Sequence, residues 1–343
     1  MSANNCGYRL LGRKPEGLEI PEFIGSRQWG GPDLQTMRNT ILGPPLALQN
    51  SGERLLFEIE NGQKLVGSFH ADNEEDRPLV KNLVILIHGI TGSEESASVI
   101  SSAAYLISQG FPVLRLNLRG SGPSGKTSHG PFHAGLTDDL ISVLAQLPEK
   151  YRSRGVFVHA ASLGGNMLLK YLGEAVGETI VRAAVGFSVP IDLKATEQKL
   201  MEKRNSLYHG YILQGLKSQA NLNLAREGYP VSVTNAALAA ESIYEFDDKY
   251  VAKIHNLGGA ENYYASQSAT GFLAEILKPT LLVHAENDPW VPARIYEERN
   301  WPEDKNITVL LTDDGGHAGF HTQDNKVPWH DRLAALFFDL HLS

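Results

Sequence analysis

From residue 83 onward, the sequence alternates short apolar runs with amphipathic stretches, and this alternation limits the possible folds more than any other feature. Continuous apolar runs of about six residues are typical of strands that are buried on both faces of a parallel sheet. The strands predicted in this way are residues 83–88, 112–118, 155–160, 183–188, 280–285 and 307–312. The stretches between them predict helices at residues 97–109, 135–150, 163–175, 293–299 and 327–341. Alternating strands and helices predict an α/β fold, with a mostly parallel central sheet and helices on both of its faces.

Two intervals depart from this alternation. Residues 1–50 show no sustained periodicity, so we expect an N-terminal arm that packs on the core. Residues 190–277 contain several helix-like segments and no comparable buried strand. This pattern predicts a helical lid, inserted over the open end of the sheet, where such insertions form substrate pockets. The core is therefore expected in two parts, residues 51–189 and residues 278–343.

A hairpin is predicted near the start of the core. Two β-like runs, residues 54–60 and 64–71, are separated by Asn61 and Gly62. This dipeptide is typical of a tight turn between antiparallel strands. We expect the hairpin at an edge of the sheet.

Composition and charge exclude several classes of protein. The formal net charge is −8 and no dense cluster of Lys and Arg occurs, which argues against a nucleic-acid partner and favours uncharged substrates. The single cysteine, Cys6, cannot form an intrachain disulfide, and its place near the N-terminus argues against a cysteine nucleophile. The N-terminus has no signal-peptide pattern, and no window approaches about 20 apolar residues. We therefore expect a cytoplasmic protein without a membrane span.

Polar residues follow several of the predicted strands at the point where each strand ends. A glycine-containing loop, residues 89–92, follows the first of them, and Ser162, Asp288 and His317 each follow a later one. Because the carboxyl ends of parallel strands meet at one edge of a sheet, we expect these residues to lie close together. The chain order serine, aspartate, histidine is the order in which nucleophile, acid and base occur in serine hydrolases with such a sheet.

Each of the three residue types has a chemical reason to be there. A serine hydroxyl is a weak nucleophile at neutral pH, so a histidine must accept its proton while it attacks. A buried carboxylate holds that histidine in the correct tautomer and stabilises its charged form. The sequence predicts Ser162 as nucleophile, His317 as general base and Asp288 as the orienting acid. Backbone N–H groups of Ile90 and Leu163 are the predicted oxyanion hole.

Other interpretations of these residues remain open at this point. Ser162 could lie in an ordinary loop, and His317 in a surface loop. For the acid, Glu286, Asp313 and Asp314 compete with Asp288, which could also be a turn residue before a proline.

Two further motifs point to other chemistry, but both are weak. Residues 120–125, GSGPSG, match the spacing of a dinucleotide-binding loop, although a proline interrupts the match and no helix begins directly after it. The pairs His129/His133 and His317/His321 have the i, i+4 spacing of zinc ligands, yet lie in loops interrupted by Gly and Pro. We therefore predict no cofactor and no metal.

Longer segments resemble the YheT-like family of α/β-hydrolases, bacterial carboxylesterases related to abhydrolase-domain lipases and to medium-chain acyl-ethanol acyltransferases. The segments that carry the resemblance are DLQT (33–36), HGITGS (88–93), NLRGSGPS (117–124), HAGLTDDL (133–140), SLGGNMLLKYLGE (162–174), SVPIDL (188–193), EFDDKYVAKIHNLGGAENYYASQSA (245–269) and AENDPWVP (285–292). The resemblance implies the α/β-hydrolase fold and places the nucleophile, acid and base on the same three residues. One departure is Ala160, where the family usually has glycine.

The function expected from these observations is that of a serine carboxylesterase. It would hydrolyse short- to medium-chain acyl esters, small molecules, through a Ser-His-Asp triad and an acyl-enzyme intermediate. The alternatives are an acyltransferase that passes the acyl group to an alcohol, a lipase acting on acylglycerols or phospholipids, and a non-catalytic ligand-binding protein on the same scaffold.

Overall fold

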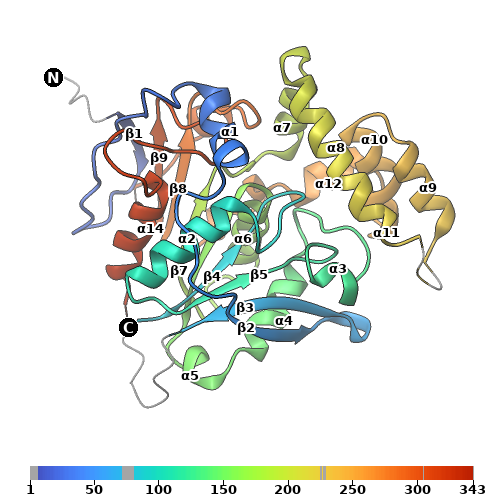
Figure 1. Cartoon of the computed structure of the whole chain (residues 1–343), viewed down its shortest axis with the longest axis horizontal. Coiled ribbons are helices and arrows are strands. Elements are labelled where there is room, and N and C mark those ends of the chain that lie inside the picture. The colour runs from blue at the N-terminus through green and yellow to red at the C-terminus, as the bar shows by residue number, and fades with distance from the viewer. Residues whose placement is uncertain (1–6, 72–80, 225, 227–228, 304, 343) are drawn as a thin grey trace.

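The computed structural model describes residues 7–71, 81–224, 226, 229–303 and 305–342, so Cys6 lies outside the described residues. Its centre is a nine-stranded sheet with the strand order β1-β9-β8-β7-β6-β4-β5-β3-β2 (Figure 1). The strands are β1 (Tyr8–Gly12), β2 (Glu53–Glu58), β3 (Lys64–His70), β4 (Leu83–Ile87), β5 (Val113–Leu116), β6 (Val156–Ala161), β7 (Val181–Phe187), β8 (Thr280–Ala285) and β9 (Ile307–Thr312).

The six strands predicted from apolar runs, β4 to β9, are confirmed and form the parallel part of the sheet. Each pairs in parallel with its neighbours in the order β5-β4-β6-β7-β8-β9. Their side chains are buried along almost their whole length, as expected for strands that are covered on both faces. The predicted α/β fold is therefore confirmed.

The predicted hairpin is also confirmed, at one edge of the sheet. Strands β2 and β3 pair antiparallel, and the backbone N–H of Ile59 donates to the carbonyl of Gln63 at 2.8 Å. Asn61 and Gly62 have φ angles of 57° and 70° in this turn. Because both angles are positive, the turn favours residues that tolerate the left-handed region, and asparagine followed by glycine meets this need.

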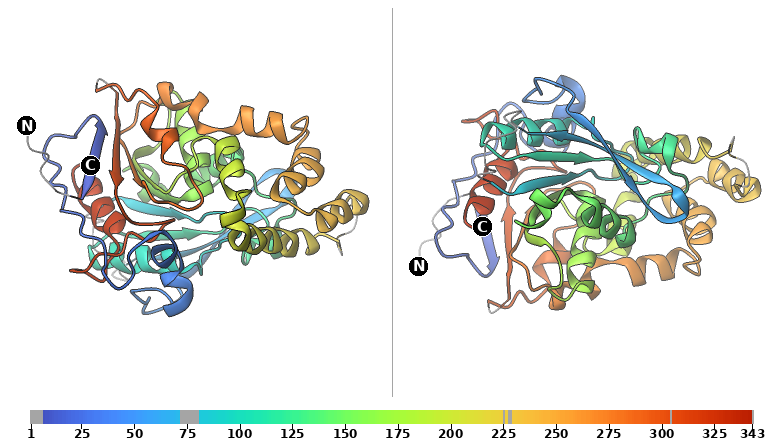
Figure 2. Two further views of the ribbon diagram at one scale, coloured as in Figure 1. Left: turned by 90° about the horizontal axis from the view of Figure 1, so that it is seen from above. Right: turned by 90° about the horizontal axis from the view of Figure 1, so that it is seen from below.

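Helices cover the two faces of the sheet in separate layers (Figure 2). One face packs against α2 (Ala97–Ser108) and α14 (Trp329–Asp339). The other packs against α4 (Thr137–Gln146), α5 (Glu149–Arg152) and α6 (Ser162–Glu174). Residues 135–150 were expected as one helix; the break comes at Pro148, which has no N–H to continue the helical hydrogen bonds.

Between residues 190 and 277 the described chain is helical, and these helices gather at one end of the molecule, yellow to orange in Figure 1. They have an apolar cluster of their own, built around residues such as Ile212, Phe246 and Tyr263. The helices are α7 (Leu193–Leu200), α8 (Ser206–Asn221), α9 (Val231–Ala239), α10 (Ile243–Phe246), the π-helical turn Asp247–Val251, α11 (Ala252–Ile254) and α12 (Ala260–Gln267). We keep the name lid for residues 190–277, as a proposal about their role.

The remaining elements are short. The helices among them are α3 (Ser124–Thr127) and α13 (Arg294–Glu297), the second shorter than the predicted 293–299. Single 3₁₀ turns occur at Glu60–Gly62, Lys203–Asn205, Ala269–Gly271 and Leu273–Glu275. No helix of the described chain is long and apolar enough to cross a membrane.

Residues 1–50 contain two elements that the sequence did not predict. Strand β1 pairs antiparallel with β9 and extends the sheet at its other edge. Helix α1 (Pro32–Leu42) follows further along, and Gln35 is its one fully buried residue. A helix that buries a single polar side chain has no apolar stripe, which explains why no helical period is visible in its sequence.

Candidate active site

Ser162 lies at a sharp turn between strand β6 and helix α6. Its φ angle is 47°, a strained value for a residue with a side chain, and such strain is typical of a serine presented at the top of a sheet. Two glycines let helix and strand approach closely. A Cβ added at Gly164 would lie 2.4 Å from the carbonyl oxygen of His88, and one at Gly165 would lie 2.4 Å from Val189 Cγ2. Substitution of either glycine would therefore push the helix away from the sheet.

The structure brings Ser162, His317 and Asp288 together into one hydrogen-bonded chain. His317 Nδ1 lies 2.8 Å from Asp288 Oδ2, and His317 Nε2 lies 3.0 Å from Ser162 Oγ. Because an ionised carboxylate can only accept, Nδ1–H donates to Asp288, which leaves Nε2 of the neutral ring free to accept the Ser162 hydroxyl proton. The three residues come from separate strand ends, as predicted.

Asp288 is completely buried, and its hydrogen bonds favour its ionised form. Its Oδ1 accepts hydrogen bonds from the backbone N–H groups of Trp290, at 2.8 Å, and Val291, at 3.0 Å. Burial alone would raise the pKa of this carboxyl, but the charge and hydrogen bond of His317, with the neighbouring His284, lower it below its usual range. Asp288 therefore stays ionised beside the imidazole.

The three competing acids lie elsewhere. Glu286 accepts a hydrogen bond from Arg9 at 2.7 Å on the surface, and Asp313 is exposed. Asp314 accepts from Asn287 Nδ2 at 2.7 Å and from the backbone N–H of Gly31. Of the four candidates, only Asp288 contacts His317 in the described structure.

Sequence analysis missed two residues that contact the loop of His317. The Trp290 ring stacks on the His317 ring, with centroids 4.1 Å apart and planes at 23°. Ser188 Oγ, at the end of β7, accepts the backbone N–H of Ala318 at 2.9 Å. Ser188 is the last residue of the predicted strand 183–188, and Trp290 follows the predicted strand 280–285, so their position at the edge of the sheet was the available signal.

The predicted oxyanion-hole residues, Ile90 and Leu163, both line the pocket that contains Ser162. Leu163 is in the first turn of α6, where backbone N–H groups have no partner within the helix. His88 fixes the loop of Ile90, because its Nδ1 donates to the Gly89 carbonyl at 2.8 Å and its Nε2 accepts the N–H of Leu118 at 3.1 Å. Burial lowers the pKa of His88 to about 4. The ring therefore stays neutral, with one nitrogen that donates to Gly89 and one that accepts from Leu118.

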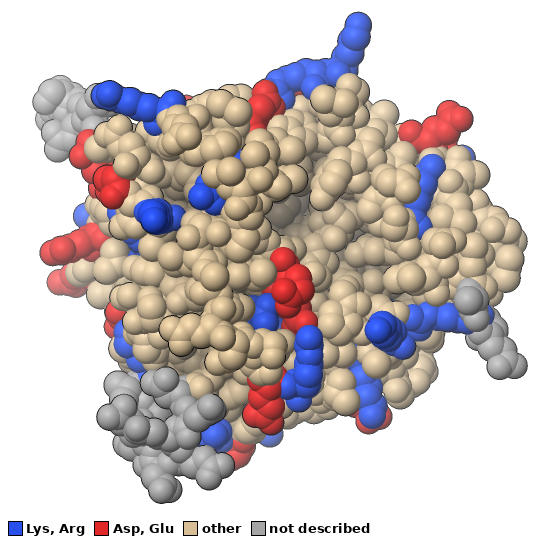
Figure 3. All heavy atoms as spheres, viewed as in Figure 1, with Lys and Arg blue, Asp and Glu red and all other residues tan. Residues whose placement is uncertain are grey.

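The pocket above Ser162 and His317 lies between the core and the lid, and its wall is mostly apolar. Figure 3 shows a hollow near the middle of this face, surrounded mainly by uncharged side chains. The apolar side chains that line the pocket are Ile90, Phe132, Leu163, Leu193, Leu200, Ile212, Leu216, Ile243, Val251, Trp290 and Val291. Polar residues that also line it include Glu197, Asp247, Tyr263 and Tyr264. Such a wall suits an apolar ligand.

The glycine-rich loop at residues 120–125 lies beside this pocket and contacts the lid. Ser121 lines the pocket, and its Oγ accepts from Gln219 Nε2 of α8 at 3.3 Å. Ser124 Oγ accepts the backbone N–H of Val66 at 2.8 Å. The loop thus contacts both strand β3 and the lid, and the four-residue helix α3 begins within it at Ser124.

One group of side chains in the described chain has the types and spacing of metal ligands. Ligand atoms of His159, His330 and Asp331 lie within 4.8 Å of one another, and all three residues are buried. Ser102 Oγ donates to Asp331 Oδ1 at 2.6 Å. We call these four residues the buried His–Asp cluster; none of them is among the described residues that line the pocket. The pairs His129/His133 and His317/His321 are not part of any such group in the described residues.

Comparison with known proteins agrees with the observed fold. A family model for the alpha/beta hydrolase fold matches residues 82–324. The chain belongs to this family. YheT of Escherichia coli (strain K12), which carries the name of an esterase, is 29% identical over 302 residues, 87% of each chain. Medium-chain fatty acid ethyl ester synthase/esterase 2 of Saccharomyces cerevisiae is 28% identical over 291 residues, 77% of this chain and 63% of its own.

A solved α/β-hydrolase structure has the same fold. The Pyrococcus furiosus esterase Pf2001 superposes with a TM-score of 0.56 over 88% of this chain and 100% of its own, at 20% identity. At this identity the likeness concerns the fold alone. The predicted α/β-hydrolase fold and the predicted resemblance to the YheT-like family are both confirmed.

Proposed function

We propose that the protein is a serine carboxylesterase that hydrolyses short- to medium-chain acyl esters. Membership of the α/β-hydrolase family and relatives that carry the name esterase indicate an enzyme of the ester-hydrolase class. The single observation that carries the proposal is the hydrogen-bonded chain from Asp288 through His317 to Ser162, with its serine end in an apolar pocket.

In the first half of the proposed reaction, Ser162 Oγ attacks the carbonyl carbon of the ester. His317 Nε2 takes the hydroxyl proton as the new bond forms, and Asp288 stabilises the resulting imidazolium through Nδ1–H. The negative charge moves to the carbonyl oxygen of the tetrahedral intermediate. Backbone N–H groups of Ile90 and Leu163 are proposed to donate hydrogen bonds to this oxyanion. One such donor stabilises the transition state by about 3 kcal/mol.

Collapse of this intermediate breaks the bond to the alcohol. His317 Nε2–H protonates the departing alkoxide, and the acyl group stays on Ser162 as an ester. In the second half, His317 takes a proton from water, which attacks the acyl-enzyme, and the carboxylic acid leaves. His317 accepts and donates the proton in each step, so the scheme requires no cofactor and no metal.

The pocket supports small, uncharged acyl esters as the substrate class. Its apolar side chains, from α7, α8, α10 and the core, can bury an acyl chain close to Ser162. The cytoplasmic location expected from the sequence stays a prediction.

The proposal is tested with p-nitrophenyl esters of increasing acyl length and with a fluorophosphonate probe. We expect wild-type protein to hydrolyse the short and medium esters and to form a covalent adduct on Ser162. Ser162→Ala should lose the adduct and lower kcat by about 10⁶-fold. Hydrolysis that persists in Ser162→Ala would exclude this serine as nucleophile. Absence of both adduct and hydrolysis in folded wild-type protein would favour a ligand-binding role.

Transfer of the acyl group to an alcohol is a second candidate function. It is favoured by the similarity to a protein named as an ethyl ester synthase and esterase, and by the apolar lid residues that line the pocket, because an apolar site disfavours water as the acyl acceptor. Product analysis with and without added ethanol separates the two functions. New ethyl ester in the presence of ethanol supports transfer, whereas free acid as the sole product in both cases argues against it.

A further inference from the structure

Helix α1 begins with the segment DLQT, residues 33–36, which the proposed reaction does not yet use. Thr36 of this segment lies 281 residues before His317 in sequence, yet the segment and the loop of His317 are in direct contact. Gln35, with an exposed fraction of 0%, is buried against that loop. A fully buried glutamine is uncommon and must satisfy its donor and acceptor groups locally.

Gln35 satisfies both groups on one residue of the loop. Its Nε2 donates to the His321 carbonyl at 2.8 Å, and its Oε1 accepts the His321 backbone N–H, also at 2.8 Å. A side-chain amide that pairs with both backbone groups of a residue fixes its position and orientation, as a neighbouring strand would.

Thr36 holds the other end of the loop, at the base itself. The backbone N–H of His317 donates to Thr36 Oγ1 at 2.8 Å. The Thr36 hydroxyl in turn donates to the Pro32 carbonyl at 2.6 Å, so its proton points away and a lone pair faces His317. Gln35 and Thr36 therefore hold the loop on either side of residues 318–320.

The loop between these two contacts is strained and packed against α1 without spare room. Ala318 and Phe320 have φ angles of 60° and 49°, which residues with side chains adopt only when their surroundings impose it. A Cβ added at Gly319 would lie 2.4 Å from the Gln35 carbonyl oxygen, and one at Gly316 would lie 2.6 Å from that of Pro32. Contacts with α1 are thus among those that impose the strained backbone.

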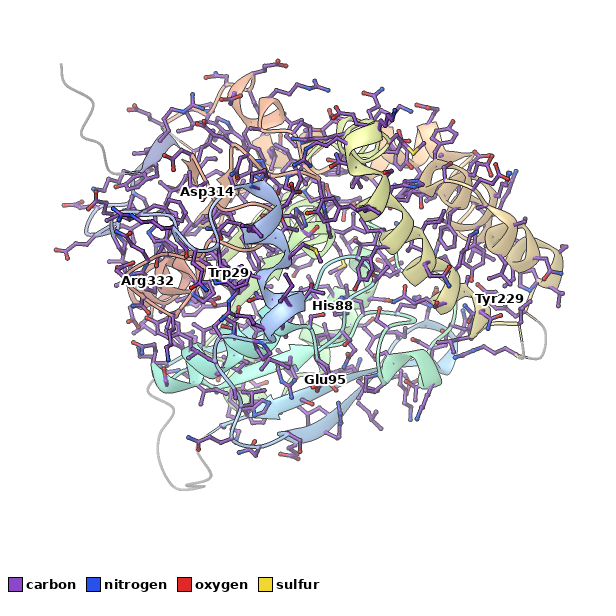
Figure 4. All side chains as sticks on the ribbon, turned by 45° about the horizontal axis from the view of Figure 1, so that its top comes forward. Trp29, His88, Glu95, Tyr229, Asp314 and Arg332 are labelled. Carbon is purple, nitrogen blue, oxygen red and sulfur yellow. The ribbon has the colours of Figure 1, made fainter. Side chains whose placement is uncertain are left out.

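Helix α1 is itself held from both sides. Before the helix, the backbone N–H of Gly31 donates to Asp314, which lies beside the arm in Figure 4. On the lid side, Asp33 accepts from Arg204 at 3.0 Å and from the Tyr208 hydroxyl at 2.8 Å. The helix can therefore act as a fixed support and not as a loose flap.

We propose that Gln35 and Thr36 are positioning residues for the general base: they hold the strained His317 loop so that Nε2 reaches Ser162 and Nδ1 reaches Asp288. The inference rests on the proposed function, because it concerns the same His317. Neither residue is among those that line the pocket, so both are expected to affect the rate of the chemical step and not the binding of substrate.

The test compares Thr36→Val with Thr36→Ser. Valine has the shape of threonine but cannot accept the His317 N–H, whereas serine keeps the hydroxyl. With a p-nitrophenyl acyl ester, we expect Thr36→Val to lower kcat about tenfold with KM unchanged, because small misplacement of a catalytic group is costly. Thr36→Ser should restore kcat to within about twofold of wild type. Inactivation by the fluorophosphonate probe should slow by the same factor as kcat, since it also needs His317 to take the Ser162 proton.

Two further variants complete the experiment. Thr40→Val makes the same chemical change at an exposed position of the same helix, and should leave kcat and KM unchanged. Gln35→Met keeps the volume and removes both hydrogen bonds, and should lower kcat at least as much as Thr36→Val. Rates are expressed per folded molecule, with the folded fraction measured by circular dichroism.

A wild-type kcat in Thr36→Val would overturn the inference, as would an equal loss in Thr36→Ser. A loss explained entirely by a lower folded fraction would also overturn it. Failure of the proposed function gives a different result: either folded wild-type protein shows no hydrolysis and no adduct, or Ser162→Ala retains hydrolysis.

Discussion

Two histidine–carboxylate groups contact the same strand, β6, and differ in what they can do. Ser162 follows the strand directly and joins His317 and Asp288 at the pocket. His159, three residues earlier, belongs to the buried His–Asp cluster with Ser102, His330 and Asp331. Both groups contain serine, histidine and aspartate.

The difference lies in the order of the contacts and in access. In the triad, histidine stands between the acid and the serine. In the buried His–Asp cluster, Ser102 binds Asp331 directly, while the nearest nitrogens of His330 and His159 lie 3.2 and 3.9 Å from Asp331 Oδ1. The ring nitrogens of both histidines make no hydrogen bond with the described residues. Residue types alone therefore do not make a nucleophile; a histidine placed between acid and serine, at a pocket, is needed.

The largest expected effect is a loss of activity on substitution of Asp288, the aspartate of the triad. Asp288→Asn should lower kcat by about 10⁴-fold, because an amide cannot hold His317 in the tautomer that accepts the serine proton. Glu286→Gln makes the same change at a surface carboxylate and should keep the wild-type kcat. Steady-state hydrolysis of a p-nitrophenyl ester measures both. A small effect of Asp288→Asn would remove the distinction between the two groups.

The second prediction is a loss of stability on substitution of Asp331, the aspartate of the buried His–Asp cluster. Asp331→Ala should lower the free energy of unfolding by about 3 kcal/mol, because it leaves the Ser102 hydroxyl without its acceptor and removes the charge beside His330 and His159. Urea denaturation measures this loss, and Asp313→Ala, at an exposed site, is the control. At temperatures where the variant is folded, kcat should stay within about twofold of wild type. A large loss of kcat in folded Asp331→Ala would show that the cluster serves the reaction.

The third prediction concerns the pH dependence of stability. Burial lowers the pKa of His159 from 6.5 to about 3, so the folded protein keeps this ring neutral while the unfolded chain takes up a proton below pH 6.5. Its contribution to stability is therefore present above pH 6.5 and is lost as the pH falls toward 3. Between pH 7 and pH 5, the loss of unfolding free energy should be about 2 kcal/mol smaller in His159→Leu than in wild type. Equal losses in both proteins would mean that His159 is already charged in the fold.

The smallest effect is expected at Ala160, which lies on β6 between His159 and Ser162. Its side chain is buried in the core on the face opposite to His159. Ala160→Gly restores the residue usual in the family and should cost less than about 1 kcal/mol of stability, the usual penalty for glycine in a strand. Its kcat should equal or exceed the wild-type value. A large loss of activity would mean that the methyl group supports the turn at Ser162.

The sequence was sufficient to place Ser162, Asp288 and His317, and the reason is geometric. Buried parallel strands are visible as apolar runs, and their carboxyl ends meet at one edge whatever the exact register of the pairing. A residue just after such a run is therefore placed near the others without knowledge of any side-chain contact. The same argument gave Ile90 and Leu163 as oxyanion-hole residues. Both line the pocket, and their role in binding an oxyanion stays a prediction.

The sequence did not predict strand β1 or helix α1, because neither carries a strong pattern of its own. Strand β1 is only partly buried and owes its conformation to pairing with β9. Helix α1 buries one polar residue, Gln35, whose partner His321 lies 286 positions further along the chain. Contacts at that separation depend on how the whole chain packs, so the hydrophobic periodicity of a local segment does not predict them.

By itself, then, the sequence determined the order of strands and helices and the three residues that meet at the end of the sheet, because hydrophobic periodicity is a local property. Tertiary structure alone brought His159, His330 and Asp331 together with Ser102 in the core, away from the pocket. It also brought Thr36 to the backbone of His317. These outcomes depend on burial and on distances between remote segments, which exist only once the chain has packed.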